Sequence, residues 1–427
     1  MPIISVCMIN NKYIKNSIWL VSEKLIVLLG GFLITTLVAR YIGVEAMGKL
    51  SLGITLSALC IIVSQWGANF TIFNDSVSKP KESLNTIYST FKLRVSLYII
   101  SWFIVSLCLY CFLETIDAIF VSLVCLSNIF LALDVYQFYF NGTLESKVNT
   151  KSTLFGKVFS ILFRTLVVVF GLSVWLIVLS LFLEGLIILQ SKRKEAAKFS
   201  VDDSFIGTRN YLKKGLPFLV SGVMVFTYSK INEIYIQKFM SFHELGIYST
   251  MLLLSSVWLF LPLSIGTSYL TRSIETKNKN DLAAVYFIVI LVSLPVILLF
   301  HFFGSIFISF TFGLSYASGA ELLPIMTITS MLSTLSFLTN RYIGSFKNGS
   351  RYVLYKSIIM AVVSLVFTWI MIDYFGLYGA VISILFLEVS NSTFGNYFFN
   401  KGEIFRAHVK IFSIRKNIEL LLDKKAA

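Results

Sequence analysis

Long apolar runs separated by short polar segments fill most of the 427-residue chain. A helix needs about twenty apolar residues to cross the hydrocarbon core of a bilayer. The run over 153–190 is too long for one span, and the Gly171-Leu172-Ser173 turn is predicted to divide it. The pattern therefore predicts about twelve membrane-spanning helices, near 17–39, 50–70, 93–113, 117–140, 153–172, 174–190, 215–237, 246–268, 282–303, 321–343, 354–373 and 376–399.

Positive charge is concentrated in every second connection between these helices. Arg94 is counted in one of these cation-rich connections and Lys192 in another. The connections that alternate with the cation-rich ones hold few cations. Because cytoplasmic loops of membrane proteins are rich in Lys and Arg, this alternation predicts that both termini are cytoplasmic. It also predicts a chain organised as an N-terminal six-helix half, a cytoplasmic linker, a C-terminal six-helix half and a basic cytoplasmic tail, with bounds 1–190, 191–214, 215–400 and 401–427.

The two halves are predicted to be repeats of each other. At an offset of 198 residues Arg40 aligns with Lys238 and Gly48 with Gly246, and in both places a span ends in a cation before a glycine-containing loop. Six spans per half make the second half enter the membrane from the same side as the first. The sequence thus predicts a parallel repeat, an arrangement found in transporters that rock two halves around a central site.

Composition supports a membrane protein and excludes a soluble one. Hydrophobic residues make up 56% of the chain and charged residues 14%, against roughly 25% charged residues in soluble domains. The net charge of +14 is explained by the cytoplasmic connections, so we expect no nucleic-acid partner. The five cysteines and three histidines are scattered, and we expect no metal site and no nucleotide-binding loop.

Charged residues inside the predicted spans are the candidate functional groups, because a charge at mid-bilayer is costly without a partner or a use. Cations directed into a helix bundle would suit an anionic, phosphorylated substrate, and arginine matches phosphate through its planar set of donors. The candidates for substrate binding are Lys24, Arg164, Lys230 and Arg341. The carboxylates that could couple transport to protons or sodium are Glu23, Asp134, Glu233 and Glu388.

Structural roles are open alternatives for several of these residues. Arg164 and Glu184 are predicted at similar depth on successive helices and could form an internal ion pair. Lys230 and Glu233 are three residues apart and could pair on one helix. Arg341 lies near the inner end of its span, where a long side chain can extend to the headgroups.

Three segments resemble the Wzx-type polysaccharide flippases of the multidrug/oligosaccharidyl-lipid/polysaccharide exporter superfamily. They are NSIWLVSEKLIVLLGGFLITTLVARYIGVEAMGKLSLG at 16–53, the 215–262 region with its Leu-Gly-Ile-Tyr-Ser run at 245–249, and YFGLYGAVIS at 374–383. The resemblance implies an all-α, MATE-like membrane fold and the flipping of an undecaprenyl-diphosphate-linked oligosaccharide, such as an O-antigen unit, across the bacterial inner membrane. It also implies a polysaccharide polymerase and a chain-length regulator as partners. One departure is that the acid of the span near 215–237 stands at Glu233, beside Asn232.

Two other function classes are weighed against the flippase. A polysaccharide polymerase or ligase would carry catalytic residues on a large extracytoplasmic loop, and the longest such connection, near 304–320, is short and uncharged. A drug/cation antiporter of the same fold would favour an acidic cavity over a cationic one. We therefore expect a transporter that uses no cofactor and draws on a proton or sodium gradient.

Overall fold

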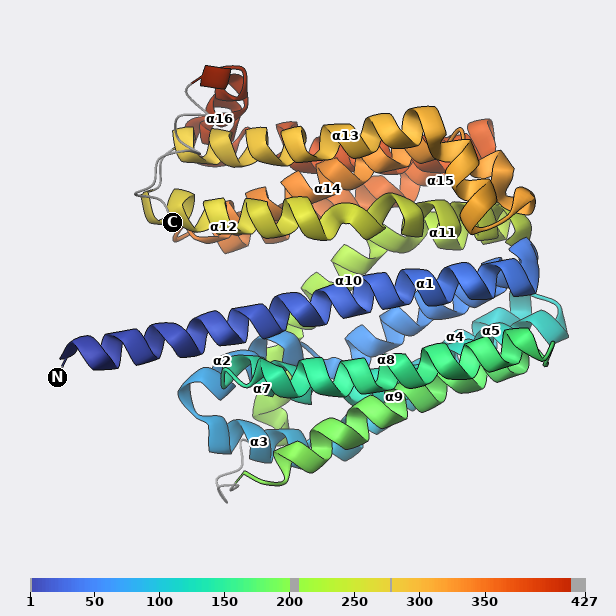
Figure 1. Cartoon of the computed structure of the whole chain (residues 1–427), viewed down its shortest axis with the longest axis horizontal. Coiled ribbons are helices and arrows are strands. Elements are labelled where there is room, and N and C mark those ends of the chain that lie inside the picture. Colours follow the sequence, from blue (N-terminus) through green and yellow to red (C-terminus); the bar gives the residue numbers. More distant parts are fainter. Residues whose placement is uncertain (1, 200–206, 277–278, 416–427) are drawn as a thin grey trace. The chain divides into compact units, whose positions relative to one another are not determined.

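The computed structural model describes residues 2–199, 207–276 and 279–415, and these residues fold as helices joined by short turns (Figure 1). The α-helices are α1 (Pro2–Gln65), α2 (Ala68–Ser78), α3 (Pro80–Ser89), α4 (Phe91–Phe112), α5 (Thr115–Ser127), α6 (Ile129–Leu133), α7 (Tyr136–Gly142), α8 (Ser146–Val169), α9 (Trp175–Ala196), α10 (Thr208–Phe239), α11 (Phe242–Ser256), α12 (Phe260–Thr276), α13 (Lys279–Thr311), α14 (Leu323–Gly344), α15 (Gly349–Ser392) and α16 (Glu403–Ile411). Four short 3-10 helices complete the set: η1 (Val257–Leu259), η2 (Leu314–Gly319), η3 (Phe394–Asn396) and η4 (Phe399–Lys401).

The chain forms two compact units. The N-terminal unit is Met1–Phe226 and the C-terminal unit is Thr227–Ala427, so the boundary falls within α10. Helix α9 continues to Ala196 and α10 begins at Thr208, so both helices extend into the predicted 191–214 linker. The predicted extracytoplasmic connection near 304–320 is also largely helical, because α13 runs to Thr311 and η2 follows it.

Eight helical stretches in the described part of the chain are long and apolar enough to cross a membrane. Together with the fold, they make this a multi-pass, all-α membrane protein. The predicted spans 215–237 and 321–343 lie in α10 and α14, which fall outside this group. The total of about twelve spans therefore stays a prediction. The eight stretches are Leu25–Gln65, Phe91–Phe112, Thr115–Gly142, Ser146–Val169, Trp175–Ala196, Phe242–Leu270, Asn280–Thr311 and Gly349–Asn396.

Glycines with positive φ divide the two longest stretches. The 41 residues of Leu25–Gln65 would extend about 60 Å as one straight helix at 1.5 Å per residue, twice the hydrocarbon thickness of about 30 Å. Gly43 interrupts this stretch with φ 78° and ψ 174°, and Gly376 interrupts α15 with φ 55° and ψ −131°. Glycine adopts such angles without a Cβ penalty. Gly43 lies between the predicted spans 17–39 and 50–70, and Gly376 is the first residue of the predicted span 376–399.

The predicted turn at residues 171–173 is confirmed. Helix α8 ends at Val169, Gly171 has φ 60°, and α9 begins at Trp175. The hairpin lays α8 and α9 side by side in the N-terminal unit (Figure 1). The predicted span 117–140 is not one continuous helix, since the chain breaks at Asn128 and again at Asp134, giving α5, α6 and α7.

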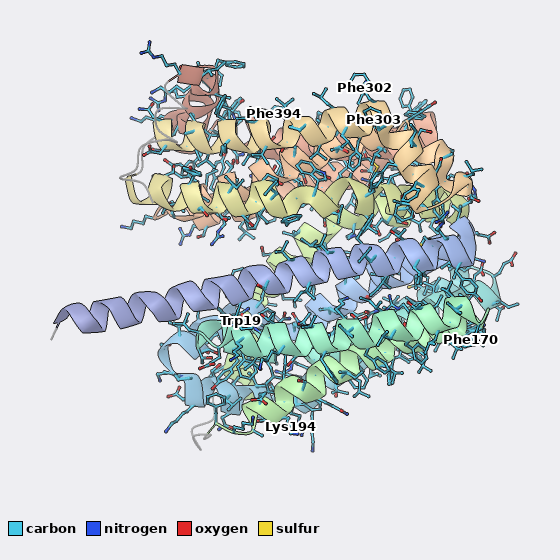
Figure 2. All side chains as sticks on the ribbon, in the orientation of Figure 1. Trp19, Phe170, Lys194, Phe302, Phe303 and Phe394 are labelled. Atoms are coloured by element: carbon cyan, nitrogen blue, oxygen red, sulfur yellow. The ribbon has the colours of Figure 1, made fainter. Side chains whose placement is uncertain are left out.

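The outer surface of each unit is apolar. Phe302 and Phe303 point outward from α13 (Figure 2), and Phe103 and Leu107 are similarly exposed on α4. Water would make such a surface costly at about 25 cal/mol per Å², whereas lipid tails accept it. The interior combines apolar clusters with many polar side chains. Many serine and threonine hydroxyls there donate to the carbonyl three or four residues earlier, as Thr327 does to Leu323 O at 2.7 Å.

The apolar core of the C-terminal unit joins α13, α14 and α16. Leu282 and Tyr286 of α13, Leu338 of α14, and Ile404 and Ala407 of α16 pack in one buried cluster. This packing holds the short helix α16 across the ends of two long ones, and Figure 1 shows α16 beside the first turns of α13.

His408 on α16 gives this contact a predicted pH dependence. Its ring packs against Tyr286 of α13 at 4.8 Å and against Tyr397, whose hydroxyl lies 3.1 Å from Nδ1. Glu403, the carboxylate of the same helix, instead accepts a hydrogen bond from Tyr342. Burial lowers the pKa of His408 from 6.5 to about 4.

The folded chain therefore binds fewer protons than the unfolded chain between about pH 4 and 6.5, so stability falls as the pH is lowered through that window. We expect the unfolding temperature to drop between pH 7 and pH 5, and His408→Phe to reduce that drop. The exposed His243→Gln is the matched control and should keep it. An identical pH response in the wild type and His408→Phe would contradict the prediction.

Candidate functional site: charges inside the helix bundles

The α8–α9 hairpin holds a cluster of three charged side chains. Lys157 Nζ lies 2.6 Å from Glu184 Oε1, and Arg164 Nη2 lies 3.4 Å from Glu184 Oε2. Arg164 Nε also donates to Ser180 Oγ at 2.6 Å. Lys157 and Arg164 are seven residues apart and so lie on one face of α8, which here is the face toward α9.

Close packing fixes this cluster. A Cβ on Gly156 would lie 2.5 Å from Ile188 Cγ1, so only glycine lets α8 approach α9 this closely. Ile188 is one turn from Glu184 on α9. The predicted Arg164–Glu184 pair is therefore confirmed, and Arg164 is only 8% exposed. Two cations share one carboxylate, which leaves the cluster with a net positive charge.

A second buried ion pair joins Asp134 to Lys192. Asp134 lies at the break between α6 and α7, and its Oδ2 is 2.6 Å from Lys192 Nζ on α9. Lys192 was predicted as a cytoplasmic loop cation, and this was wrong: α9 continues past it, and its side chain is 2% exposed. The sequence signal that was missed is the helical spacing of the buried residues of α9, which continues from Ile188 through Lys192 to Ala196.

Arg94 was also predicted as a loop cation and is likewise buried. Its residue is 0% exposed within α4. Nη1 donates to Thr90 Oγ1 and Nη2 to Ile87 O, both at 2.6 Å. The guanidinium thus bonds the polar groups at the start of its own helix and the end of α3.

The C-terminal unit contains the Lys230–Glu233 pair. Lys230 Nζ lies 2.6 Å from Glu233 Oε1 on α10, so the predicted pairing three residues apart is confirmed. Glu233 is buried, whereas about a third of the Lys230 side chain is exposed. Beside them Asn232 is fully buried and its Oδ1 accepts a hydrogen bond from Ser383 of α15 at 2.9 Å.

Lys356 of α15 is a buried cation that the sequence reasoning missed. Its ammonium donates to Asn340 Oδ1 at 2.5 Å, to Asn396 Oδ1 at 2.8 Å and to Asn391 O at 3.3 Å. An ammonium has three N–H donors, so all three are directed at neutral oxygens. The sequence signal was available, since Lys356 stands near the start of the predicted span 354–373.

Glu388 lies near this lysine on the second arm of α15. Its Oε2 accepts from Ser336 Oγ of α14 at 3.0 Å, and Lys356 attracts it electrostatically. Lysine and glutamate thus recur in the same order on the last two spans of each predicted six-helix half, as Lys157 and Glu184 in one and as Lys356 and Glu388 in the other.

The remaining predicted site residues are Arg341, Glu23 and Lys24. Arg341 is exposed in the last turn of α14, with its guanidinium carbon 5.7 Å from the centre of the Phe337 ring. Glu23 and Lys24 lie on α1, but their side chains are outside the described part of the structure. Arg164 belongs to the N-terminal unit, and Lys230 and Arg341 to the C-terminal unit.

A protein-family model described as "polysaccharide biosynthesis protein" matches residues 13–268, more than half of the chain. The chain belongs to this family. The match takes in the α8–α9 cluster, the Asp134–Lys192 pair and the Lys230–Glu233 pair. It confirms the expected likeness to polysaccharide flippases at the level of the family. No curated protein is similar enough in sequence to match.

Solved structures share the fold of this family member. A structure of the lipid II flippase MurJ in an inward closed conformation aligns with a TM-score of 0.66 at 15% identity, covering 96% of this chain and 93% of the other. An inward-facing multidrug resistance MATE family transporter of the MOP superfamily aligns with a TM-score of 0.64 at 13% identity, covering 92% and 96%. At such identities the likeness establishes the fold alone, and it confirms the predicted MATE-like architecture.

Glu184 offers a test of the α8–α9 cluster. Glu184→Gln leaves two cations buried without a counter-charge, and breaking a buried pair costs about 3–5 kcal/mol. We expect a clear fall in the unfolding temperature of the purified protein, measured by scanning fluorimetry. Glu195→Gln is the matched control on the same helix, because its pair with Lys198 is exposed and should contribute little. Equal shifts for the two variants would contradict the assignment.

Lys356 offers an independent test in the C-terminal unit. Lys356→Met keeps an unbranched side chain, one heavy atom shorter, but removes the donor from buried amide oxygens, at a cost of about 1–3 kcal/mol. The expected result is a lowered unfolding temperature in the same assay. Arg351→Met removes an exposed cation from α15 and should leave that temperature nearly unchanged. A Lys356→Met protein as stable as the wild type would show that the three hydrogen bonds contribute nothing.

Proposed function

We propose that this protein is a flippase that moves an undecaprenyl-diphosphate-linked oligosaccharide, such as an O-antigen repeat unit, across the bacterial inner membrane. The observation that carries the proposal is membership of the polysaccharide biosynthesis family together with a fold shared with a lipid II flippase. The family places the protein in polysaccharide synthesis, and the fold is that of transporters. A lipid-linked sugar is the cargo that fits both.

The diphosphate is the part of this cargo that is hardest to carry past lipid. Cations at membrane depth would offset its charge, and arginine binds phosphate through two parallel N–H donors. Lys230 and Arg341 suit this role best, because their side chains are partly or largely exposed. Arg164 and Lys24 complete the proposed set, with Arg164 acting through the net positive charge of its cluster with Glu184.

Alternating access is the proposed mechanism, with the lipid tail remaining in the bilayer. A proton or sodium gradient is the proposed energy source, without a cofactor. Of the four candidate carboxylates, Asp134 and Glu233 are each within 2.6 Å of a lysine, while Glu388 accepts a hydrogen bond from a serine. Glu388 is therefore the favoured coupling group, ahead of Glu23, Asp134 and Glu233.

The orientation proposed is that of the charge pattern, with both termini in the cytoplasm. The six-helix halves 1–190 and 215–400, the linker 191–214 and the basic tail 401–427 remain proposals from the sequence, and α9 and α10 each extend into the linker. A polysaccharide polymerase and a chain-length regulator are the proposed partners on the same pathway. A polymerase-type enzyme is the weaker reading of this chain itself, because both structural relatives described above are transporters.

A drug/cation antiporter is a second candidate, because a multidrug transporter shares the fold. It would use buried carboxylates such as Glu388 and Glu233 to bind an organic cation. Saturable binding of rhodamine 6G or ethidium to the purified protein, lost in Glu388→Gln, would favour the antiporter. A protein that binds lipid-linked oligosaccharide and neither dye would favour the flippase.

Deletion of the gene in its native host tests the proposal directly. Lipid-linked repeat units should accumulate on the cytoplasmic face, and the wild-type gene should restore surface polysaccharide. Repeat units that reach the outer face but stay unpolymerised would contradict the flippase proposal and favour a polymerase-type enzyme.

The cationic site has its own test in the same strain. We expect Lys230→Ala with Arg341→Ala to lower export on the order of tenfold or more, because a hydrogen bond to a charged group contributes about 1.5–3 kcal/mol. Lys198→Ala, which removes an exposed cation of the N-terminal unit, is the control. Full export by the double variant, at normal protein level, would rule out these two cations as the diphosphate site.

A further inference from the structure

Helix α16 carries apolar side chains on two of its sides. One side, with Ile404 and Ala407, is buried against the C-terminal unit. The other side exposes Phe405 and Val409, and Phe412 directly after the helix is 85% exposed. These three residues are spaced at i, i+4 and i+7 and so form one apolar stripe. The stripe is not part of the buried core cluster of the C-terminal unit.

The position of α16 along the spans follows from its contacts. Lys410 Nζ is 2.5 Å from Asn280 Oδ1 in the first turn of α13, and Glu403 accepts from Tyr342 in the last turn of α14. The last candidate span ends at Asn396, seven residues before α16 begins. Helix α16 thus lies across the ends of α13, α14 and the last candidate span, on the side of the bundle where hydrocarbon gives way to headgroups.

Positive charge accompanies the apolar stripe. Residues 398–415 hold four cations, Lys401, Arg406, Lys410 and Arg415, and one carboxylate, Glu403. Arg406 and Arg415 are exposed, and Glu403 is occupied by hydrogen bonds from Tyr342 and Asn400. An apolar stripe flanked by Arg and Lys is typical of helices that lie in the plane of an anionic membrane surface.

The apolar exposure is continuous with the last span. Phe394 and Phe398 are exposed at its end, and the ring of Phe405 packs on that of Tyr397 at 5.1 Å. The lipid that covers the span is therefore the nearest occupant for the stripe. This continuity and the charge favour the bilayer over a second protein.

We propose that α16 and residues 412–415 form an interface helix that anchors the C-terminal unit to anionic phospholipid. Phe405, Val409 and Phe412 enter the acyl-chain region of the leaflet. Arg406 and Arg415 bind headgroup phosphates of the same leaflet. This anchor does not depend on the proposed transport function.

The test places a fluorescent probe beside the stripe. Ser413→Cys, in a full-length chain whose five native cysteines are replaced, is labelled and reconstituted into nanodiscs of phosphatidylcholine alone or mixed with phosphatidylglycerol. Lipids carrying a quencher at the upper acyl chain report insertion. We expect quenching several-fold stronger with phosphatidylglycerol, and a return to the phosphatidylcholine level in Arg406→Gln/Arg415→Gln.

Two further variants keep the result interpretable. Arg406→Lys/Arg415→Lys preserves charge and should retain most of the quenching. Lys194→Gln/Lys198→Gln removes equal charge from the end of α9 and should change nothing. An unquenched probe in both lipids would place the stripe in water and overturn the proposal in favour of a protein partner. Equal quenching in both lipids would overturn the anionic selectivity. Transport is not measured, so failure here is distinct from failure of the flippase.

Discussion

The low dielectric of the bilayer is the constraint on which this structure depends. Water cannot solvate a charge at mid-membrane, so the protein must supply the partners itself. Glu184 forms ion pairs with two cations, and Asp134 forms one with Lys192. The Lys356 ammonium donates its hydrogen bonds to three neutral oxygens. Each arrangement joins residues of different helices or helix arms, so charge neutralisation also fixes how the helices pack.

Hairpins place these partners within reach. Two helices that meet at a tight turn bring residues at comparable distances from that turn to similar depth, and Arg164 and Glu184 meet in this way. Glycine is needed at the turn, as at Gly171 with φ 60°, and where the helices touch, as at Gly156. Small residues at such contacts permit the dense packing that holds membrane helices together. The packing of the helices and the placement of the charges therefore depend on each other in this chain.

Hydropathy alone predicts much of the fold and part of the site. Apolar runs located helices throughout the chain, and depth counting paired Arg164 with Glu184. Sequence reasoning failed for Lys192, Arg94 and Lys356, because a cation near the end of an apolar run looks the same whether it faces water or a buried partner. The breaks at Asn128 and Asp134 were missed for a related reason, since hydropathy does not record where a backbone leaves helical geometry.

The α8–α9 cluster has a consequence for energetics in a living cell. Two cations and one carboxylate leave about one unit of positive charge held rigidly inside the N-terminal unit. A charge within the membrane senses the transmembrane voltage, at about 2.3 kcal/mol per elementary charge moved across 100 mV. Any displacement of this hairpin along the membrane normal therefore carries gating charge. Voltage acts directly on the balance between any two conformations of the protein that place this hairpin at different depths.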